Sequence, residues 1–266
     1  MTNLDRILEA VRRRLSAAKA GDDASSVAER AHAVRRDSLP HRLREEIGRK
    51  DRVNIIAEIK RASPSKGVIN DLIDPEATAR LYERGGACAV SVLTETDFFQ
   101  GSIDDLLRVR KAVSLPILRK DFIVDEFQIY EAAVAGADAV LLIVAALDPE
   151  DLIDLQARAH DLGMDALVEV HTREELAIAK DIGAGLIGVN NRDLRTLEVS
   201  LDVSHELIEH APVNALMIAE SGLTNRGDLV ELRSLGYSGF LIGETLMRSA
   251  DPEAEIKTLT AAAGGE

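Results

Sequence analysis

Short apolar runs alternate with longer segments of helical periodicity along most of the chain, beginning at about residue 53. There are eight apolar runs, at 53–60, 87–94, 115–120, 137–144, 165–170, 185–190, 214–220 and 239–243. Few of them alternate apolar with polar residues, so we expect both faces of each strand to be buried, as in parallel strands covered by helices. Helices are expected at 75–85, 102–113, 125–135, 149–162, 173–182, 201–210, 225–235 and 252–262.

A weak internal repeat supports this alternation. Four segments share the order helix end, glycine, strand: ERGGACAVSVL, VAGADAVLLIV, DIGAGLIGVN and SLGYSGFLIG. Glycine is favoured just past a helix end, where a left-handed conformation is common. Eight βα units with right-handed crossovers close most naturally into a (β/α)8 TIM barrel. The alternative is a doubly wound open sheet, but no switch point interrupts this even series.

The first 50 residues precede the first expected strand. We interpret them as a helical extension (1–50) of a single domain whose barrel occupies 51–266. Their apolar positions follow helical spacing, at Leu4, Ile7, Leu8, Val11 and Leu15. This spacing predicts an amphipathic helix packed on the barrel. A basic organelle-targeting segment is the alternative, and its acidic residues Asp5 and Glu9 argue against it.

Acidic residues outnumber basic ones, 46 to 32, so the 266-residue chain carries a net charge of −14. Such a chain has no overall attraction for nucleic acid or an anionic membrane, and an anionic ligand must be held by a local cluster of donors. The apolar runs are too short to span a bilayer. Cys88 is the only cysteine, which excludes an intramolecular disulfide and a thiolate metal cage and favours a cytoplasmic location.

Polar residues and glycines gather near the carboxyl ends of the expected strands, where catalytic groups lie in barrels of this kind. They are Glu58, Lys60, Thr94, Glu95, Lys120, Asp121, Glu169, Asn190, Arg192, Glu220, Ser221, Gly222, Gly243 and Glu244. Glu58 and Lys60 are two positions apart, so a strand points both to the same side. Two lysines beside three glutamates are costly to bury without a function, and the perturbed pKa values of such a cluster suit acid–base catalysis.

Two glycine-bearing turns follow the last two strands, at Ser221-Gly222 and Gly243-Glu244. Barrels of this kind bind phosphate there through backbone N–H groups, so we expect one phosphate site formed by both turns. The fourth apolar run, 137–144, stays apolar to its end and is a candidate wall for a flat apolar group.

Four other signals are interpreted as having no catalytic or cofactor role. The G-x-G-x-x-G spacing at 183–188 closes a helix and enters a strand, the reverse of a dinucleotide-binding turn. His205 and His210 lie on an expected outer helix and lack a third metal ligand. His171 is expected to be a solvated loop residue, and Cys88 a small core residue.

Seven segments, in order, carry a resemblance to a known family. They are IIAEIKRASPSKG (55–67), SVLTETDFFQGS (91–102), PILRKDFIVDEFQIYEA (116–132), LVEVHTREEL (167–176), IGVNNRDLRTLEV (187–199), IAESGL (218–223) and FLIGETLMR (240–248). Together they resemble indole-3-glycerol phosphate synthases. The resemblance implies a TIM barrel of tryptophan biosynthesis that converts 1-(2-carboxyphenylamino)-1-deoxyribulose 5-phosphate to indole-3-glycerol phosphate, losing carbon dioxide and water. It also implies that no metal or organic cofactor is used.

The resemblance further implies roles for the residues at the strand ends. Lys120 resembles the general acid that protonates the ketose carbonyl oxygen, Glu169 the general base, and Glu58 its electrostatic partner. Lys60 resembles the lysine that binds anionic groups of the substrate and donates a proton in dehydration. Asn190 and Glu220 would bond substrate hydroxyls or orient the lysines.

The remaining implied residues bind the substrate. Ser63 and Arg192 match motif positions that line the site. The anthranilate ring would be enclosed by Phe99, Phe122, Leu141, Ile143, Leu194 and Leu197. The phosphate would be held by Ser221, Gly222, Gly243 and Glu244, largely through backbone N–H groups. An acidic side chain beside phosphate is unfavourable, so only the N–H of Glu244 is expected to face the anion.

We therefore expect an enzyme, a carbon–carbon carboxy-lyase that acts as a cytoplasmic monomer on a phosphorylated small molecule. One alternative is another phosphate-binding barrel, such as phosphoribosylanthranilate isomerase or the tryptophan synthase α subunit. The isomerase needs a cysteine base at an early strand end, whereas Cys88 lies near a strand start. The other alternative is a non-catalytic phosphosugar-binding barrel, against which the intact Lys60, Lys120 and Glu169 argue.

Overall fold

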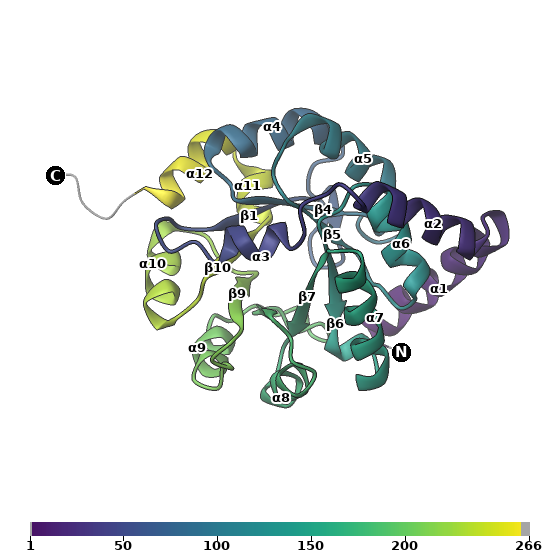
Figure 1. Cartoon of the computed structure of the whole chain (residues 1–266). Helices are drawn as coiled ribbons and strands as arrows, with labels where there is room; N and C mark the ends of the chain where they lie inside the picture. Colours follow the sequence, from purple (N-terminus) through teal and green to yellow (C-terminus); the bar gives the residue numbers. More distant parts are fainter. Residues whose placement is uncertain (1, 262–266) are drawn as a thin grey trace.

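Eight parallel strands close into a barrel in the computed structural model, which describes residues 2–261 (Figure 1). The order around the barrel is β1-β10-β9-β8-β7-β6-β5-β4, and β4 pairs with β1. The strands are β1 Ile55–Ile59, β4 Ala89–Leu93, β5 Ile117–Lys120, β6 Ala139–Ile143, β7 Asp165–Val170, β8 Leu186–Asn190, β9 Leu216–Glu220 and β10 Gly239–Ile242. The expected TIM barrel is confirmed, and its closure rules out the open sheet.

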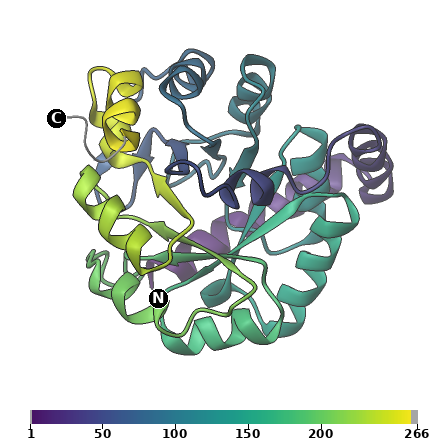
Figure 2. The ribbon, with the colours of Figure 1, turned by 60° about the vertical axis from the view of Figure 1, so that its left-hand side comes forward.

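A ring of helices covers the outside of the barrel, as Figures 1 and 2 show. They are α4 Pro75–Gly85, α5 Ile103–Ala112, α6 Glu126–Val134, α7 Pro149–Asp161, α8 Arg173–Asp181, α9 Asp202–Ile208, α10 Arg226–Leu235 and α12 Pro252–Thr260. Each lies where the periodicity predicts a helix. The glycines of the repeat follow four of these helices with positive φ, at Gly86, Gly136, Gly183 and Gly236.

Three small elements after strand ends were not predicted. They are the hairpin of β2 Ala62–Ser63 and β3 Gly67–Val68, the 3₁₀ turn η1 Val144–Ala146, and the short helix α11 Glu244–Arg248. All are too short to show a clear hydrophobic period. The hairpin and α11 lie beside the candidate site.

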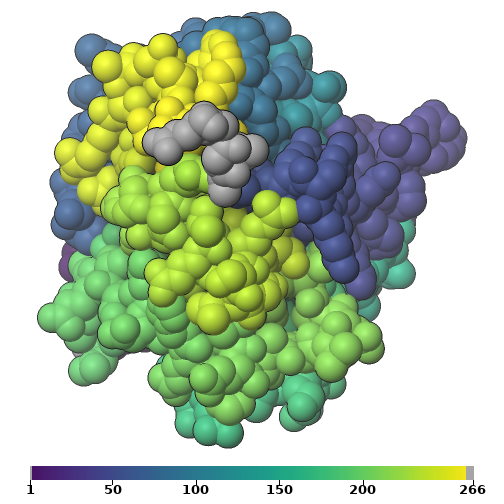
Figure 3. Space-filling view, turned by 90° about the vertical axis from the view of Figure 1, so that its left-hand side faces the viewer, coloured from purple at the N-terminus to yellow at the C-terminus, as the bar shows by residue number. Residues whose placement is uncertain are grey.

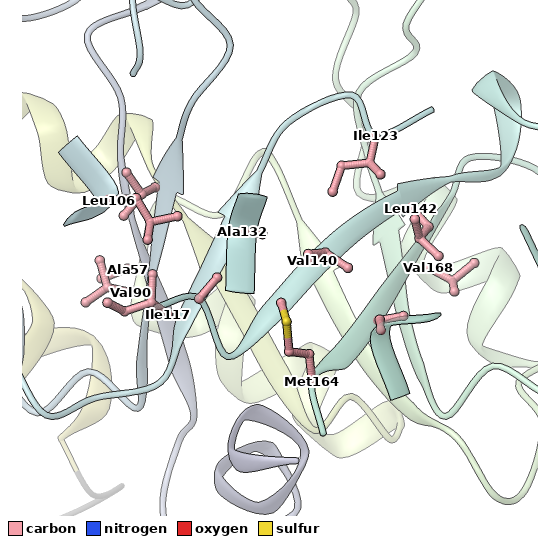
Figure 4. Close-up of a cluster of buried hydrophobic side chains, with 14 of the residues drawn as sticks. Ala57, Val90, Leu106, Ile117, Ile123, Ala132, Val140, Leu142, Met164 and Val168 are labelled. Atoms are coloured by element: carbon pink, nitrogen blue, oxygen red, sulfur yellow. The ribbon is translucent and has the colours of Figure 1, made fainter. Parts of the chain in front are cut away.

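Side chains of each strand alternate between two apolar layers. Odd positions of β1, such as Ile55 and Ala57, pack outward against the helices, while Ile56 points into the barrel. Figure 4 shows part of the outer layer, where Leu106 and Ala132 of the helices meet Val90, Ile117 and other strand residues. The same alternation makes polar side chains at strand ends point into the barrel. Glu58, for example, follows the inward-pointing Ile56 by two positions.

Three helices precede the barrel: α1 Asn3–Gly21, α2 Ala24–Arg35 and α3 Arg42–Ile47. The apolar stripe of α1 packs on residues of the barrel interior, as its helical spacing predicts. α3 covers the amino end of the barrel with Leu43 and Ile47, whereas the start of α1 reaches the carboxyl end (Figure 2). In the space-filling view, the purple segment of α1 and α2 projects beyond the barrel (Figure 3).

Buried and half-buried charges fasten this extension to the barrel. Arg14 of α1 bonds Glu95 at 2.6 Å and Asp97 at 2.7 Å. At the amino end, the buried carboxylate of Asp138 receives Arg42 of α3 at 3.1 Å and Arg35 of α2 at 3.4 Å. A buried carboxylate that keeps such partners is stabilised, so these contacts fix how α1 to α3 lie on the barrel.

Candidate active site

A cavity of about 860 Å³ opens at the carboxyl ends of the strands. Every catalytic, substrate-binding and phosphate-binding residue expected from the sequence lines it: Lys120, Glu169, Lys60, Glu58, Asn190, Ser63, Phe99, Phe122, Leu141, Ile143, Arg192, Leu194, Leu197, Glu220, Ser221, Gly222, Gly243 and Glu244. They come from all parts of the chain, and the closed barrel brings them to one rim. Their common location is shown by the structure, while the role of each remains a proposal.

Lys120 occupies the centre of the polar cluster. It is the last residue of β5, and its Nζ donates to Glu169 Oε2 at 2.8 Å and lies 3.1 Å from Glu220 Oε2. Burial lowers the pKa of Lys120, but the carboxylates of Glu169 and Glu220 outweigh this effect and raise it above its usual value. The side chain is therefore held as an ammonium inside the cavity.

Glu169 receives donors on both of its oxygens. Besides Lys120 at Oε2, Asn190 Nδ2 donates to Oε1 at 3.1 Å, and His171 Nε2 lies 3.3 Å from the same oxygen. Burial raises the pKa of Glu169, but Lys120 and His171 lower it well below its usual value. Glu169 is thus a carboxylate, the form in which it can accept a proton.

Glu220 also contacts Lys120, but its surroundings differ from those of Glu169. Its Oε2 faces Lys120, but its buried Oε1 has no hydrogen-bond partner among the described residues. Burial and the neighbouring Glu169 raise the pKa of Glu220 above its usual value, and Lys120 only partly offsets them. A Cβ at Gly188 of β8 would overlap the Glu220 carboxylate, so glycine there makes room for it.

Glu58 and Lys60 form a second pair on β1 and just beyond it. Glu58 Oε1 lies 2.5 Å from Lys60 Nζ, so the prediction that both point to the same side is confirmed. A Cβ at Gly243 would overlap Glu58 and approach Lys60 Nζ to 3.1 Å. The backbone after β10 therefore comes close to this ion pair only because residue 243 is glycine.

The two expected phosphate turns lie side by side, because β9 and β10 are neighbours in the barrel. Ser221 and Gly222 are consecutive residues in the left-handed region, with φ of 64° and 79°. Two such residues in a row turn the backbone sharply at the rim of the cavity. Placement at one rim is confirmed for both turns; binding of phosphate there is a proposal.

Three cations surround the side chain of Glu244 at this end of the cavity. Arg248 lies 3.1 Å from its carboxylate, Lys66 3.6 Å and Arg192 4.0 Å. Lys66 and Arg248 were not among the expected site residues, although both fall within the segments that carry the resemblance. Lys66 and Arg248 add positive charge beside the two glycine-bearing turns. A chain with a net charge of −14 can hold an anion only at such a local cluster of cations.

Apolar side chains form the opposite wall. The rings of Phe99 and Phe122 lie 6.1 Å apart between centroids, beside Leu141 and Ile143 of β6. The start of α1 completes the lining with Asn3, Leu4 and Ile7, which sequence reasoning missed. The apolar stripe of α1 was visible in the sequence, but a stripe does not say which surface it covers.

Some expectations for individual residues were wrong. The side chain of His171 is only 9 % exposed and lies between Glu169 and Glu175, so it is not a solvated loop residue. Glu95 does not line the cavity, because its carboxylate accepts backbone N–H groups of the following loop, including Phe98 at 2.7 Å. Thr94 does not line the cavity either, and its hydroxyl donates to buried Asp121 at 2.6 Å.

The signals set aside as structural behave mostly as expected. Gly183 follows α8 and leads into β8, and Cys88 is fully buried at the amino end of β4. His205 lies on α9, but His210 lies just beyond it. Among residues 2–261, no three histidine, cysteine, aspartate or glutamate side chains are placed so that together they could hold a metal ion. No helix in this range is long and apolar enough to cross a membrane.

Comparisons with known proteins were made for sequence and for fold. The family model described as indole-3-glycerol phosphate synthase matches residues 4–259. A protein of that name from Kineococcus radiotolerans is 48 % identical over 98 % of this chain and 96 % of its own. Another, from Carboxydothermus hydrogenoformans, is 50 % identical over 84 % of this chain and 86 % of its own.

Solved structures with low sequence identity share the fold. The 3-hexulose-6-phosphate synthase of Salmonella typhimurium is 14 % identical and aligns with a TM-score of 0.62 over 78 % of this chain and 96 % of its own. The N-acetylmannosamine-6-phosphate 2-epimerase of Clostridium perfringens is 16 % identical, with a TM-score of 0.57 over 77 % of this chain and 90 % of its own. At this identity the likeness concerns the barrel alone.

Proposed function

The chain belongs to the indole-3-glycerol phosphate synthase family, and from this premise we propose how its side chains divide the work of ring closure. The chain is a carboxy-lyase of tryptophan biosynthesis. Its substrate is a phosphorylated small molecule, and the other phosphate-binding barrels are not favoured as alternatives. The observation that carries the proposal is the buried Lys120 ammonium between two carboxylates, in a cavity with an apolar wall.

Lys120 is the general acid in this proposal. When the anthranilate ring carbon attacks the ketone carbon, the carbonyl oxygen gains negative charge, and a positioned ammonium stabilises that charge and donates a proton. Glu169 is the general base, since its pKa is lowered and it is ionised before the reaction starts. Asn190 orients it through the bond to Oε1.

Lys60 supplies the second cation. It follows β1 beside Glu58, which holds its ammonium near the phosphate turns. We assign Lys60 to binding substrate anionic groups and to donating a proton when water leaves. Glu58, which pairs with Lys60, is assigned as the electrostatic partner of Glu169 in the site. Glu220 orients Lys120 or bonds a substrate hydroxyl through Oε1, which has no hydrogen-bond partner within residues 2–261.

The apolar wall and the phosphate turns fix the pose of the substrate. The anthranilate carboxylate lies on the ring carbon that attacks the ketone and leaves as carbon dioxide, so it cannot anchor the ring through the whole reaction. Contact with the Phe99, Phe122 and β6 side chains must therefore orient the ring. Loss of carbon dioxide is favoured when the carboxylate lies in an apolar setting, which the same wall supplies. Ser63 and Arg192 close the polar side of the cavity.

Mixing the protein with 1-(2-carboxyphenylamino)-1-deoxyribulose 5-phosphate tests the function directly. We expect the indole absorbance and fluorescence of the product to appear without added metal or cofactor. A substrate that stays unchanged would contradict the activity, whereas binding without turnover would indicate a phosphosugar-binding barrel.

We also propose that the chain acts as a cytoplasmic monomer whose residues 1–50 and 51–266 form one domain. The contacts of α1 to α3 with the barrel and the single buried cysteine support this arrangement. Light scattering coupled to size-exclusion chromatography measures the oligomeric state, and a mass twice the chain's 28.8 kDa would contradict the monomer.

Glu244→Gln should strengthen binding at the phosphate end. Its carboxylate now neutralises Lys66, Arg192 and Arg248 and would repel a phosphate held by the adjacent turns. Two like charges about 5 Å apart in a wet site repel by about 1 kcal/mol, so we expect KM and the inhibition constant of inorganic phosphate to fall about three- to tenfold. Steady-state kinetics with phosphate as a competitive inhibitor measures both.

Glu253→Gln is the matched control, since Glu253 also pairs with two cations but lies on α12, away from the cavity. It should change neither constant. If Glu244→Gln likewise leaves both unchanged, the phosphate binds elsewhere in the cavity.

The tip of the loop after β1 should close over bound substrate. Its base is anchored, because the Arg61 carbonyl accepts the N–H groups of Ile69 at 2.7 Å and Asn70 at 3.0 Å. Its tip, residues 66–68, is exposed, and Gly67 has a φ of 65°. Contact of Lys66 with substrate phosphate would order the tip and exclude water.

Amide hydrogen exchange should therefore slow at residues 66–68 when the enzyme binds the alcohol form of the substrate, which lacks the ketone and cannot cyclise. The amides of Ile69 and Asn70 serve as an internal control, because they bond the Arg61 carbonyl at the base of the loop and not at its exposed tip. Identical exchange at the tip with and without ligand would show that the loop is a rigid turn.

A further inference from the structure

His171 lies behind the proposed base, on the side away from Lys120. It follows β7 directly, and its Nε2 is 3.3 Å from Glu169 Oε1 while its Nδ1 is 3.0 Å from Glu175 Oε2. Nε2 is buried, and among the described residues it has no hydrogen-bond partner of good geometry. The ring thus bridges two carboxylates, and its inner nitrogen faces the one assigned to catalysis.

Glu175 holds the ring in this place. It is the third residue of α8, and its Oε2 accepts the backbone N–H of His171 at 2.7 Å as well as contacting the ring. Thr172 caps the same helix through a bond from the Glu175 N–H at 3.2 Å. The bond from the His171 N–H alone would let the Glu175 carboxylate cap the start of α8. The contact between Glu175 and the imidazole ring is therefore a second interaction, beyond capping.

We propose that His171, held by Glu175, is a positioning residue that keeps Glu169 ionised and fixes its orientation. The imidazolium and Asn190 engage Oε1, which leaves Oε2 to Lys120. When Lys120 gives its proton to the substrate, Glu169 loses its neighbouring cation. His171 then remains as the second cation, so Glu169 stays available as a base. This inference rests on the proposed role of Glu169.

The charged surroundings of His171 favour its protonated form. Its outer side borders a second cavity of about 490 Å³, whose charged lining residues are Glu175, Asp193, Arg195 and Glu198. On its inner side, His171 faces the carboxylate of Glu169. Behind that carboxylate lie the ammonium of Lys120 and the carboxylate of Glu220. Burial lowers the pKa of His171, but Glu169 and Glu175 outweigh it and raise the pKa to about 10.

His171→Gln tests the role of the charge, because glutamine can still reach Glu169 with a neutral amide. Without the imidazolium the pKa of Glu169 rises, so less of the base is ionised at low pH and more recovers as pH increases. We expect kcat/KM to fall about tenfold near pH 4 relative to the unmodified enzyme, and the deficit to shrink toward pH 7 with KM unchanged. A deficit that is equal at every pH would overturn the proposal.

Three further variants test whether the effect is specific to the pair of His171 and Glu175. Glu175→Gln should give a smaller deficit with the same pH dependence, and adding it to His171→Gln should have no further effect. An additive double variant would show that Glu175 does not act through His171. His205→Gln is the matched control, since His205 also faces a glutamate, at 3.4 Å, but lies on the outer helix α9.

Nuclear magnetic resonance of the ring nitrogens tests the same idea without any change at position 171. His171 should remain an imidazolium through neutral pH and titrate near pH 10, and Glu175→Gln should lower that pKa. Titration near 6.5 would overturn the proposal. Failure of the base assignment is distinguishable, because Glu169→Gln would then retain activity whatever His171 does.

Discussion

Lys120→Ala should lower kcat by about 10²–10⁴ while the barrel stays folded. The substitution removes the one ammonium placed between Glu169 and Glu220, where the ketone oxygen is proposed to gain charge. Binding should change less, because the phosphate turns and the apolar wall remain. Single-turnover kinetics separates the chemical step from binding.

The Lys120→Ala substitution should also change the protonation of the neighbouring carboxylates, Glu169 and Glu220. Two buried carboxylates left without their cation repel each other, so one of them should hold a proton at neutral pH. Lys111→Ala is the control, since Lys111 is exposed on α5. A Lys120→Ala enzyme with more than about a tenth of the original kcat would contradict the general-acid role.

The barrel and the content of its active site could be predicted from the sequence because both follow from local regularities. Continuous apolar runs indicate parallel strands, and the strand period of two places Lys120 inward with Leu118 in the same way that it places Glu58 with Ile56. Carboxyl ends of parallel strands share one rim, so residues picked out at separate ends meet in one cavity.

The features that could not be predicted depend on contacts between segments far apart in the sequence. The apolar stripe of α1 indicates burial, but only the folded chain shows that Leu4 and Ile7 cover the cavity. Glu95 occupies a strand end, yet its carboxylate accepts N–H groups of the next loop and meets Arg14 of α1. No spacing rule distinguishes such an anchor from a catalytic group.

The misreading of His171 has a similar cause. A histidine two positions after Glu169 lies just past the strand, where a loop residue is normally solvated. Burial comes from Glu175, which reaches back from the first turn of α8 to the ring and to the backbone N–H. The pattern of a histidine four residues before a glutamate at a helix start is the one signal in the sequence that could have indicated this contact.

Glu169→Gln should also reduce kcat by about 10²–10⁴, because the amide keeps the shape of the side chain and cannot accept the proton. The amide has one oxygen where the carboxylate has two, so it satisfies either Lys120 or Asn190 but not both. The pKa of Lys120 should consequently fall, since it loses the Glu169 carboxylate, which raises that pKa most, while its burial remains.

The pH dependence distinguishes a lost base from a general distortion of the site. In the unmodified enzyme the pKa of Glu169 is lowered, so activity that needs its carboxylate should persist below the usual carboxyl range. In Glu169→Gln no increase in pH can restore the base, and kcat should stay low throughout. Glu174→Gln, an exposed neighbour on α8, should leave both the rate and its pH profile unchanged. A Glu169→Gln enzyme with an unchanged rate would make Glu169 a structural counter-ion of Lys120, and the base would have to be sought at Glu220, the other carboxylate within reach of that ammonium.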